Sequence, residues 1–499
     1  MKTTLGIDLG SQSIKIIFYN YQKKEVVAEA SSPLEVITDS NGRAEQISDW
    51  WLDALKISLK KIPSAIRNSV KAIGISGQQH GFVATNRNGK VLTPVKMWCD
   101  TSTQSEAEEI TVACGGEKSL ISSSGNRMLA SYTATKIAWF KKNKPDCYKK
   151  LAHILLPHDY LNYVLTGKYV MEYGDASGTG FLNIKTRKWC NKILNAIDPD
   201  RDLSKCLPRL SQPNQFIGKT TIEFAKKYGL PDGVAVSTGG GDNMMGAIGT
   251  NNVTTGKLTM SLGSSGTIYA YSDKPIIDPS GNIAAFCSST GGWLPLLCTM
   301  NCTLSTEIIR NLLKVKINQF DNLIANVNAG SDGLIMLPFF NGERTPYIPQ
   351  GNGCFFGLTF DNCSKGHFLR ATVEGATFAL KFGLDQLTKL NVKQDEIILT
   401  GGGSNSAIWC QIVADICQLP VIKLKHTEAA AFGAALQALW ALKCQNDPTI
   451  KIKDITSDHI NFGGSSQFIP DPKNMHIYDQ NFSEYKYAVE KIINTKKIN

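Results

Sequence analysis

Asp242 directly follows three consecutive glycines, Gly239 to Gly241, and is itself followed by Asn243. Glycines allow a tight turn or a close approach of the backbone to a ligand. A carboxylate held at such a turn can accept a proton from a hydroxyl, so Asp242 is a candidate general base. The alternative is an ordinary surface turn, in which Gly-Asp-Asn is common.

Asp8 is a second candidate carboxylate, at the start of a predicted β-hairpin. Residues 4–18 form two β-rich runs that a short polar turn joins. The main-chain N–H groups, the two hydroxyls and the lysine of this turn suit a phosphate, and Asp8 could lie beside a hydrated Mg²⁺. The candidate phosphate-binding residues are Gly10, Ser11, Gln12, Ser13 and Lys15. A plain hairpin with a charged tip is the alternative.

The same turn recurs about half a chain later. Leu262, Gly263 and Ser264 repeat Leu9, Gly10 and Ser11, and the second turn continues through Ser265, Gly266 and Thr267. Alternating strand and helix patterns of similar extent follow each copy. The repeat therefore predicts a duplicated α/β fold whose two halves face a central cleft, each presenting a phosphate-binding hairpin to it.

A third glycine-rich turn contains Gly401, Gly402 and Asn405. It follows a strand pattern and precedes a helix pattern, which is an arrangement suited to a nucleotide. The turn matches neither GxGxxG nor the P-loop, so a Rossmann dinucleotide site and a Walker-type ATPase are not supported.

Polar side chains that could bind a sugar follow the buried-strand pattern of residues 72–76. Gln79, His80 and the main chain of Gly81 can hydrogen-bond hydroxyl groups. Trp98 and Asp100 add an aromatic face and a carboxylate. A structural histidine at His80 and core positions for Trp98 and Asp100 are the alternatives.

Composition narrows the class of protein. The 499 residues carry a formal charge of +10, but the lysines are scattered without interleaved aromatics, so no nucleic-acid partner is expected. The 13 cysteines form no CxxC pair, which favours reduced thiols over zinc ligands. The longest apolar tract, residues 429–442, contains Gly433 and Gln437 and is too short for a membrane span. We expect a cytoplasmic protein without a membrane partner.

Taken together, these segments resemble the FGGY carbohydrate kinases over nearly the whole chain, from Gly6 to about Ala441. The resemblance is carried by the stretches 131–140 and 353–375, and by motifs around Ala44-Glu45-Gln46, Gln78-Gln79-His80, Leu156-Pro157-His158-Asp159, Gly241-Asp242-Asn243 and Gly342-Glu343-Arg344. Glycerol-specific members usually carry Arg-Glu where this chain has Gln79-His80, which favours a ketose.

The resemblance implies the sugar kinase/actin-like ATPase (ribonuclease H-like) fold, with an N-terminal sugar-binding domain at 1–246 and a C-terminal nucleotide-binding domain at 247–499. It implies that the protein uses Mg-ATP to phosphorylate the terminal hydroxyl of a ketopentose. D-xylulose is the expected substrate. Asp242 matches the catalytic base, Asp8 the carboxylate needed for activity, and both match metal-binding positions. Gln79, His80, Gly81, Asp242, Asn243, Trp98 and Asp100 match sugar contacts. The two hairpins match phosphate contacts, and Gly401, Gly402 and Asn405 match the nucleotide turn.

One departure concerns Asp100. Many family members have an arginine shortly after the Trp-x-Asp motif, whereas Thr101, Ser102 and Thr103 follow here, and hydroxyls cannot replace its bidentate contacts. A kinase for ribulose or another ketose or polyol, a non-catalytic sugar sensor and an actin-like ATPase remain alternatives, and a homodimer is left open.

Overall fold

The computed structural model describes residues 1–340, 342–348, 350–424, 428–460 and 466–496, with side chains to residue 492. The chain divides into two compact units. The first comprises Met1–Thr254, Tyr271–Leu294 and Glu428–Asn461, and the second comprises Thr255–Ala270, Pro295–Thr427 and Phe462–Asn499. The chain thus enters each unit more than once, and the domain boundary between residues 246 and 247 stays a prediction.

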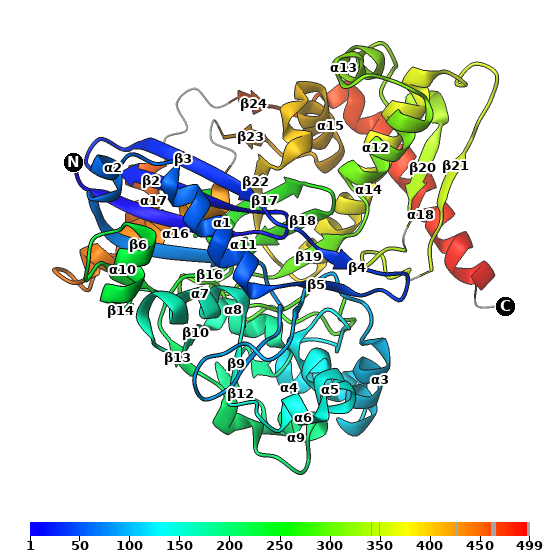
Figure 1. The fold of residues 1–499 in the computed structure, drawn as a ribbon. Coiled ribbons are helices and arrows are strands. Elements are labelled where there is room, and N and C mark those ends of the chain that lie inside the picture. Colours follow the sequence, from blue (N-terminus) through cyan, green and yellow to red (C-terminus); the bar gives the residue numbers. More distant parts are fainter. Residues whose placement is uncertain (341, 349, 425–427, 461–465, 497–499) are drawn as a thin grey trace. The chain divides into compact units, whose positions relative to one another are not determined.

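A twisted sheet forms the centre of the first unit (Figure 1). Its strand order is β14 (Phe216–Lys219), β15 (Ala235–Ser237), β6 (Val70–Gly77), β1 (Thr3–Leu9), β2 (Ser13–Asn20) and β3 (Glu25–Pro33), and β16 (Gly240–Gly241) also pairs with β6. β1 is antiparallel to β2 and parallel to β6. The hairpin predicted for residues 4–18 is confirmed, with Leu9 opposite Ile14.

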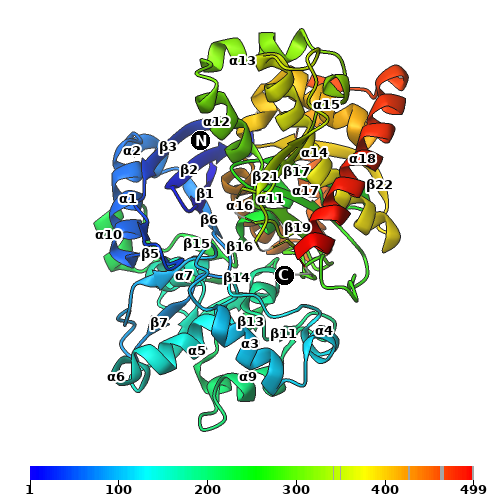
Figure 2. The same cartoon turned by 90° about the vertical axis from the view of Figure 1, so that its right-hand side faces the viewer.

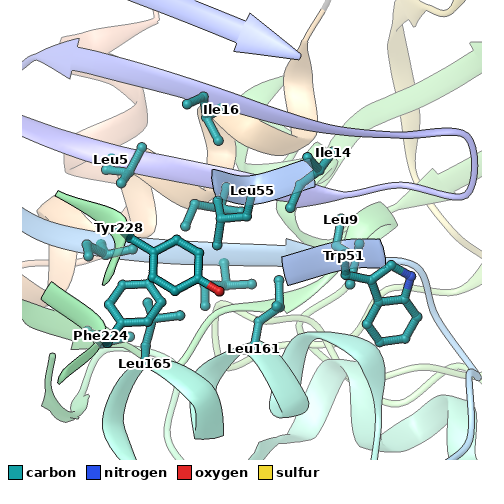
Figure 3. Packing of buried hydrophobic residues seen from close by; sticks show 14 of the residues in the cluster. Leu5, Leu9, Ile14, Ile16, Trp51, Leu55, Leu161, Leu165, Phe224 and Tyr228 are labelled. Atoms are coloured by element: carbon teal, nitrogen blue, oxygen red, sulfur yellow. The ribbon is translucent and has the colours of Figure 1, made fainter. Parts of the chain in front are cut away.

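Helices α1 (Ser48–Lys60), α7 (Pro157–Thr166) and α10 (Ile222–Tyr228) cover one face of this sheet (Figure 3). Alternate residues of β1 and β2, such as Leu5 and Ile16, point to this face because side chains alternate along a strand. They pack with Trp51, Leu161 and Phe224 of the three helices. Burial of each large apolar side chain contributes roughly 1.5–3 kcal/mol, so this layer fixes the hairpin on its sheet.

Helices α11 (Asp242–Gly249) and α16 (Ala429–Cys444) pack with each other, and α16 also packs on β1 and β6. A side chain at Gly6 of β1 would place its Cβ 1.9 Å from the carbonyl oxygen of Ala431, and one at Gly433 would lie 1.8 Å from that of Met245. Only hydrogen at these positions allows so close an approach. A helix encoded near the end of the chain therefore completes the first unit.

The other elements of the first unit extend from this sheet. They are β4 (Ile37–Thr38), β5 (Ala44–Gln46), α2 (Ser64–Arg67), β7 (Val83–Thr85), β8 (Val95–Lys96), α3 (Gln104–Ala113), α4 (Glu117–Ser124), α5 (Thr133–Asn143), α6 (Pro145–Tyr148), β9 (His153–Leu155), β10 (Val170–Glu172), α8 (Tyr173–Ala176), β11 (Leu182–Asn183), β12 (Lys188–Trp189), α9 (Asn191–Ile197), β13 (Arg209–Ser211) and α17 (Ile452–His459).

The sheet of the second unit repeats the connectivity of the first. Its order is β19 (Leu296–Thr299), β18 (Gly266–Ala270), β17 (Gly256–Leu262), β22 (Gln394–Thr400), β23 (Val421–Lys423) and β24 (Ser466–Phe468). As in the first sheet, an antiparallel group of three strands is followed by two parallel neighbours and an antiparallel edge strand. The predicted duplicated α/β core is confirmed by this strand-by-strand correspondence.

Helices surround the second sheet (Figure 2). They are α12 (Thr303–Leu312), α13 (Ile317–Ala325), α14 (Lys365–Lys389), α15 (Ala407–Cys417) and α18 (Pro472–Lys496), and a small sheet of β20 (Ile335–Pro338) and β21 (Gly353–Phe356) lies against α14. Phe378 of α14 stacks on Phe482 of α18. In the part of the chain that the structure describes, no helix combines the length and apolarity needed to cross a bilayer.

Candidate active site

The triple-glycine turn is a buried junction between a strand and a helix. Gly240 and Gly241 form β16 beside the end of β6, and Asp242 is the first residue of α11. Gly239 has φ +69°, and a Cβ at Gly241 would lie 2.7 Å from the side chain of Gln79. The glycines therefore allow β16 to pass directly beside Gln79, and the surface-turn alternative for this segment is wrong.

Asp242, Asn243 and Gln79 form one hydrogen-bonded chain. Asn243 Nδ2 donates to Gln79 Oε1 at 2.8 Å, and the main-chain N–H of Asn243 donates to Asp242 Oδ1 at 2.8 Å. The buried Nε2 of Gln79 has no hydrogen-bond partner among the described residues. The structure thus brings together three predicted sugar-site residues and leaves them one unused donor.

Burial and, as the second cause, the nearby charge of Asp8 together raise the pKa of Asp242 to about 7. Asp8 lies on β1, where Ser76 Oγ of β6 donates to its Oδ1 at 2.7 Å. Burial also raises the pKa of Asp8, while Ser76 and Lys15 oppose that shift. Two carboxylates with raised pKa values at one place are typical of a catalytic or metal-binding site.

The first hairpin tip contains the predicted residues Gly10 to Ser13, all at least partly exposed. The main-chain N–H of Gly10 donates to Ser13 O, which closes the turn. Lys15 stands opposite Asp8 in the strand register, and its Nζ lies 2.6 Å from Glu428 Oε2. Lys15 is therefore paired with a carboxylate of its own chain.

His80 adopts φ +64°, and its Nδ1 lies 2.8 Å from Gly178 O. Because a carbonyl oxygen only accepts, Nδ1 carries a proton in this contact. The ring lies 5.1 Å from that of Tyr132 and 5.9 Å from that of Phe286. Gly81 next to it is buried, and a Cβ there would meet Pro157 at 2.5 Å.

Trp98 and Asp100 hydrogen-bond other segments of the first unit. Trp98 Nε1 donates to Ser11 Oγ at 2.8 Å, which joins it to the phosphate hairpin. Asp100 is fully buried, and its two oxygens accept four hydrogen bonds, from Ala44 N, Lys96 Nζ, Ser102 N and Ser102 Oγ. Four donors use the accepting capacity of a carboxylate. Asp100 thus supports the loop that carries Trp98, and its contact with the sugar stays a prediction.

The second hairpin carries Gly263, Ser264 and Ser265 at its tip, and Gly266 and Thr267 begin β18. The N-terminal residues of α12 bind its main chain, with Cys302 N donating to Ser264 O and Thr303 N to Gly263 O. Glu343, of the Gly342-Glu343-Arg344 motif, accepts from Met300 N at 2.6 Å and so holds the segment between β19 and α12.

The third glycine turn lies beside a cavity of about 410 Å³ within the second unit. Gly401 ends β22 with φ +85°, Gly402 opens onto space, and Ser406 caps α15 by accepting from Trp409 N. The lining residues are Thr303, Thr306, Glu307, Ile317, Phe320, Asp321, Gly402, Gly403, Asn405, Ser406 and Trp409. Two of the three predicted nucleotide-turn residues thus line a cavity with both apolar and acidic walls.

Sequence reasoning assigned no role to a buried charged cluster beneath the triple-glycine turn. His158 Nδ1 lies 2.5 Å from Asp175 Oδ2, and its Nε2 lies 3.1 Å from Asp159 Oδ1. Burial lowers the pKa of His158, but the two carboxylates outweigh it and raise the pKa to about 9. A Cβ at Gly239 would lie 3.2 Å from the His158 ring, so the cluster supports the turn from below.

Gln437 of α16 also stabilises the triple-glycine turn, a role that the sequence did not predict. Its Oε1 accepts from Ser237 Oγ and Gly239 N, and its Nε2 donates to Thr238 Oγ1 and Gly239 O. The signal available in the sequence was a lone polar residue in the apolar tract 429–442. Such a residue in a buried helix needs hydrogen-bond partners, and these come from the turn before Asp242.

The comparisons with known proteins agree with this geometry. The model of the FGGY family of carbohydrate kinases, N-terminal domain, matches residues 3–249, and the model of its C-terminal domain matches residues 258–442. A xylulose kinase of Haemophilus influenzae is 43% identical over 444 residues, which are 88% of this chain and 90% of that protein.

Two solved structures extend the likeness to the fold. A xyloylose kinase from Brucella ovis has a TM-score of 0.90 with 26% identity, covering 99% of each chain. A gluconate kinase from Lactobacillus acidophilus has a TM-score of 0.89 with 25% identity, covering 98% of each chain. The expected two-domain sugar kinase/actin-like ATPase fold is confirmed. Because both family domains match and the Haemophilus influenzae relative is 43% identical, the chain belongs to the FGGY family of carbohydrate kinases and is an ATP-dependent sugar kinase.

Proposed function

We propose that this protein is a xylulose kinase, which transfers the terminal phosphate of ATP to the terminal hydroxyl of D-xylulose and releases ADP and D-xylulose 5-phosphate. The relative from Haemophilus influenzae supports the substrate. The observation that supports the mechanism is the Gln79–Asn243–Asp242 chain, which links an amide donor to a carboxylate with a raised pKa.

Asp242 acts as the general base. A carboxylate with a pKa near 7 is a better proton acceptor than an ordinary aspartate, and roughly half of it is ionised at neutral pH. As the sugar oxygen bonds to phosphorus, its proton moves to Asp242. Asn243 donates to Asp242 Oδ1 and so fixes the carboxylate while Oδ2 faces the reacting hydroxyl.

Gln79 and His80 bind the sugar in this proposal. Gln79 Nε2 donates to a sugar oxygen, and the His80 ring hydrogen-bonds a sugar hydroxyl through Nε2. The aromatic rings of Tyr132 and Phe286 beside His80 exclude water from this part of the site. The contact of Gly81 is through its main chain.

Asp8 and Asp242 fit a hydrated Mg²⁺. Both are hard oxygen donors, and the charge of Asp8 raises the proton affinity of Asp242, a repulsion that a divalent cation relieves. When bound, Mg²⁺ neutralises charge on the phosphate oxygens. Within the described residues no three His, Cys, Asp or Glu side chains gather as a metal site, which suits an ion that keeps several waters and contacts the phosphates.

The nucleotide is bound by the glycine turns. Gly263 to Thr267 and Gly10 to Ser13 bind phosphates through main-chain N–H groups and hydroxyls, and Lys15 exchanges Glu428 for a phosphate. The adenosine moiety enters the cavity beside Gly402 and Asn405, where Phe320 offers an apolar face and Asp321 an acceptor for an amino group. In this proposal, most of the sugar contacts come from the domain at 1–246 and the adenosine contacts come from the domain at 247–499.

The test is an ADP-release assay with D-xylulose, D-ribulose, L-ribulose, glycerol and gluconate. Gluconate belongs in the panel because a gluconate kinase shares the fold, so the fold does not choose the sugar. We expect the highest kcat/KM with D-xylulose. A clear preference for another sugar would overturn the substrate, and ADP release that no sugar stimulates would favour a sensor or an actin-like ATPase.

A further inference from the structure

Gln46, the last residue of β5, is fully buried, and both the nitrogen and the oxygen of its side-chain amide are hydrogen-bonded. Its Nε2 donates to Ser11 O at 2.8 Å and to Glu35 O at 2.9 Å. Its Oε1 accepts from Trp51 Nε1 at 3.0 Å and from Gln78 Nε2 at 2.8 Å. An amide has two donors and two acceptor lone pairs, so these four contacts leave none unused.

Two of the four partners belong to different parts of the proposed active site. Ser11 lies in the tip of the phosphate-binding hairpin, and Gln78 directly precedes the sugar-binding pair Gln79 and His80. We propose that Gln46 is a positioning residue that couples the sugar-binding segment 78–80 to the phosphate-binding tip of the first hairpin. The proposal rests on the proposed function, because that function gives the two segments their ligands.

The rigidity of the network supports this role. Trp51 is fully buried in the layer between α1 and the sheet, so its indole N–H fixes the orientation of the Gln46 amide. A side-chain amide held in one orientation cannot turn to follow one partner without breaking its bonds to the others. A displacement of Gln78 when sugar binds is therefore transmitted to Ser11.

A second contact strengthens the Ser11 end. Trp98 Nε1 donates to Ser11 Oγ, so the hairpin tip is held through both its carbonyl and its hydroxyl. A main-chain bond, Gln78 N to Leu9 O, also joins the two segments. Side-chain substitutions leave that main-chain bond in place and test the amide link separately.

The experiment measures binding of Mg²⁺ with a non-hydrolysable ATP analogue by calorimetry, with and without the sugar that the wild-type protein phosphorylates fastest. Gln46→Glu has the same shape but turns a carboxylate oxygen toward the two carbonyl oxygens of Ser11 and Glu35. Gln78→Leu removes only the link to the sugar segment. Asn362→Asp is the matched control, since Asn362 is a buried amide in the second unit whose Nδ2 also donates to two carbonyl oxygens.

We expect sugar to tighten analogue binding at least fivefold in the wild-type protein and in Asn362→Asp, but less than twofold in Gln78→Leu. Without sugar, Gln46→Glu should bind the analogue about tenfold more weakly, because the hairpin tip is displaced, and Gln78→Leu should bind it as the wild type does. A purely structural role would instead change the unfolding midpoint and leave the effect of sugar intact.

The proposal is overturned if Gln46→Glu binds the analogue without sugar as the wild type does, or if Gln78→Leu keeps the full effect of sugar. An equal loss in Asn362→Asp would also overturn it, since the effect would then not be specific to Gln46. Failure of the proposed function is a different result, namely no turnover of any sugar by the wild-type protein, and the sugar-free comparison with Gln46→Glu still decides on the hairpin.

Discussion

The two hairpins differ in chemistry although their backbones correspond. In the first unit Asp8 pairs with Ser76 across β1 and β6, and in the second unit Ser261 pairs with Thr400 across β17 and β22. A Cβ on Gly10 would lie 3.9 Å from the Asp8 carboxylate, and a Cβ on Gly263 would lie 3.9 Å from the Ser261 hydroxyl. The first copy thus has a carboxylate where the second has a hydroxyl.

The difference indicates that the two copies of the duplicated fold have different functions. A carboxylate can hold a cation or take a proton, whereas a neutral hydroxyl beside N–H groups tolerates the charge of a polyphosphate. Asp242, Glu172 and the His158 cluster add further ionisable groups to the first unit. The predictions below test whether chemistry belongs to the first copy and nucleotide binding to the second.

Removal of the proposed base should have the largest effect. Asp242→Asn keeps the shape of the side chain but cannot accept the proton, so kcat should fall by about 10²–10⁴. Asp49→Asn is the control, since Asp49 also lies in the first turn of a helix, α1. Near wild-type turnover by purified Asp242→Asn would assign the proton to another group.

Exchanging the residues beside the two hairpin tips, Asp8 and Ser261, should affect different kinetic constants. Asp8→Ser makes the first hairpin resemble the second and should lower kcat by roughly 10², because charge stabilisation by a metal contributes several kcal/mol. Ser261→Asp makes the second resemble the first and should raise the KM for ATP about tenfold through like-charge repulsion. Steady-state kinetics against ATP separate the two. Equal effects on kcat would show that the copies share the chemistry.

The buried histidine of the first unit should make stability depend on pH. The pKa of His158 is about 9 in the folded protein and near 6.5 in an unfolded chain, so its contribution is complete below pH 6.5 and is lost as the pH rises through 9. We expect a loss of about 1–3 kcal/mol in unfolding free energy over this range, measured by denaturant titration. His158→Gln should flatten this dependence. His153→Gln should not, because burial lowers the pKa of His153. A flat wild-type profile would mean that the cluster binds no extra proton.

The smallest effect should come from the hydroxyls beside the tips. Ser76→Ala removes the hydrogen bond to Asp8 Oδ1 and should lower kcat less than tenfold, as expected for one bond of about 1 kcal/mol. Thr400→Val changes the corresponding position of the second sheet and should leave kcat unchanged. If Thr400→Val lowered kcat more than Ser76→Ala, the division of roles between the copies would be reversed.

The sequence was most informative where a signal is local. The hairpin at residues 4–18 follows from β-rich runs around a polar turn, and its repeat at Leu262-Gly263-Ser264 revealed the duplication. The roles of Asp242 and Gln79 came from the family resemblance, and their hydrogen-bonded chain through Asn243 needed the structure.

What was missed depends on contacts between distant segments. The hydrogen bonds from Ala44 and Lys96 to the oxygens of Asp100 were not foreseen, and the contact of Asp100 with the sugar stays a prediction. Gln46 and Gln437 have no periodic pattern that would reveal a network of four hydrogen bonds. The membership of α16 in the first unit was also not visible, because the chain leaves that unit and returns to it.

The late position of α16 has a consequence for biosynthesis. Its first turn packs on Gly6 of β1, and Gln437 in its middle hydrogen-bonds the turn before Asp242. The helix nevertheless occupies residues 429–444 of the 499 residues. In a nascent chain that still lacks this helix, the glycine positions of β1 and β6 that pack on α16 are uncovered. The first unit is thus complete only after a segment far along the sequence from β1 and β6 has packed back onto them.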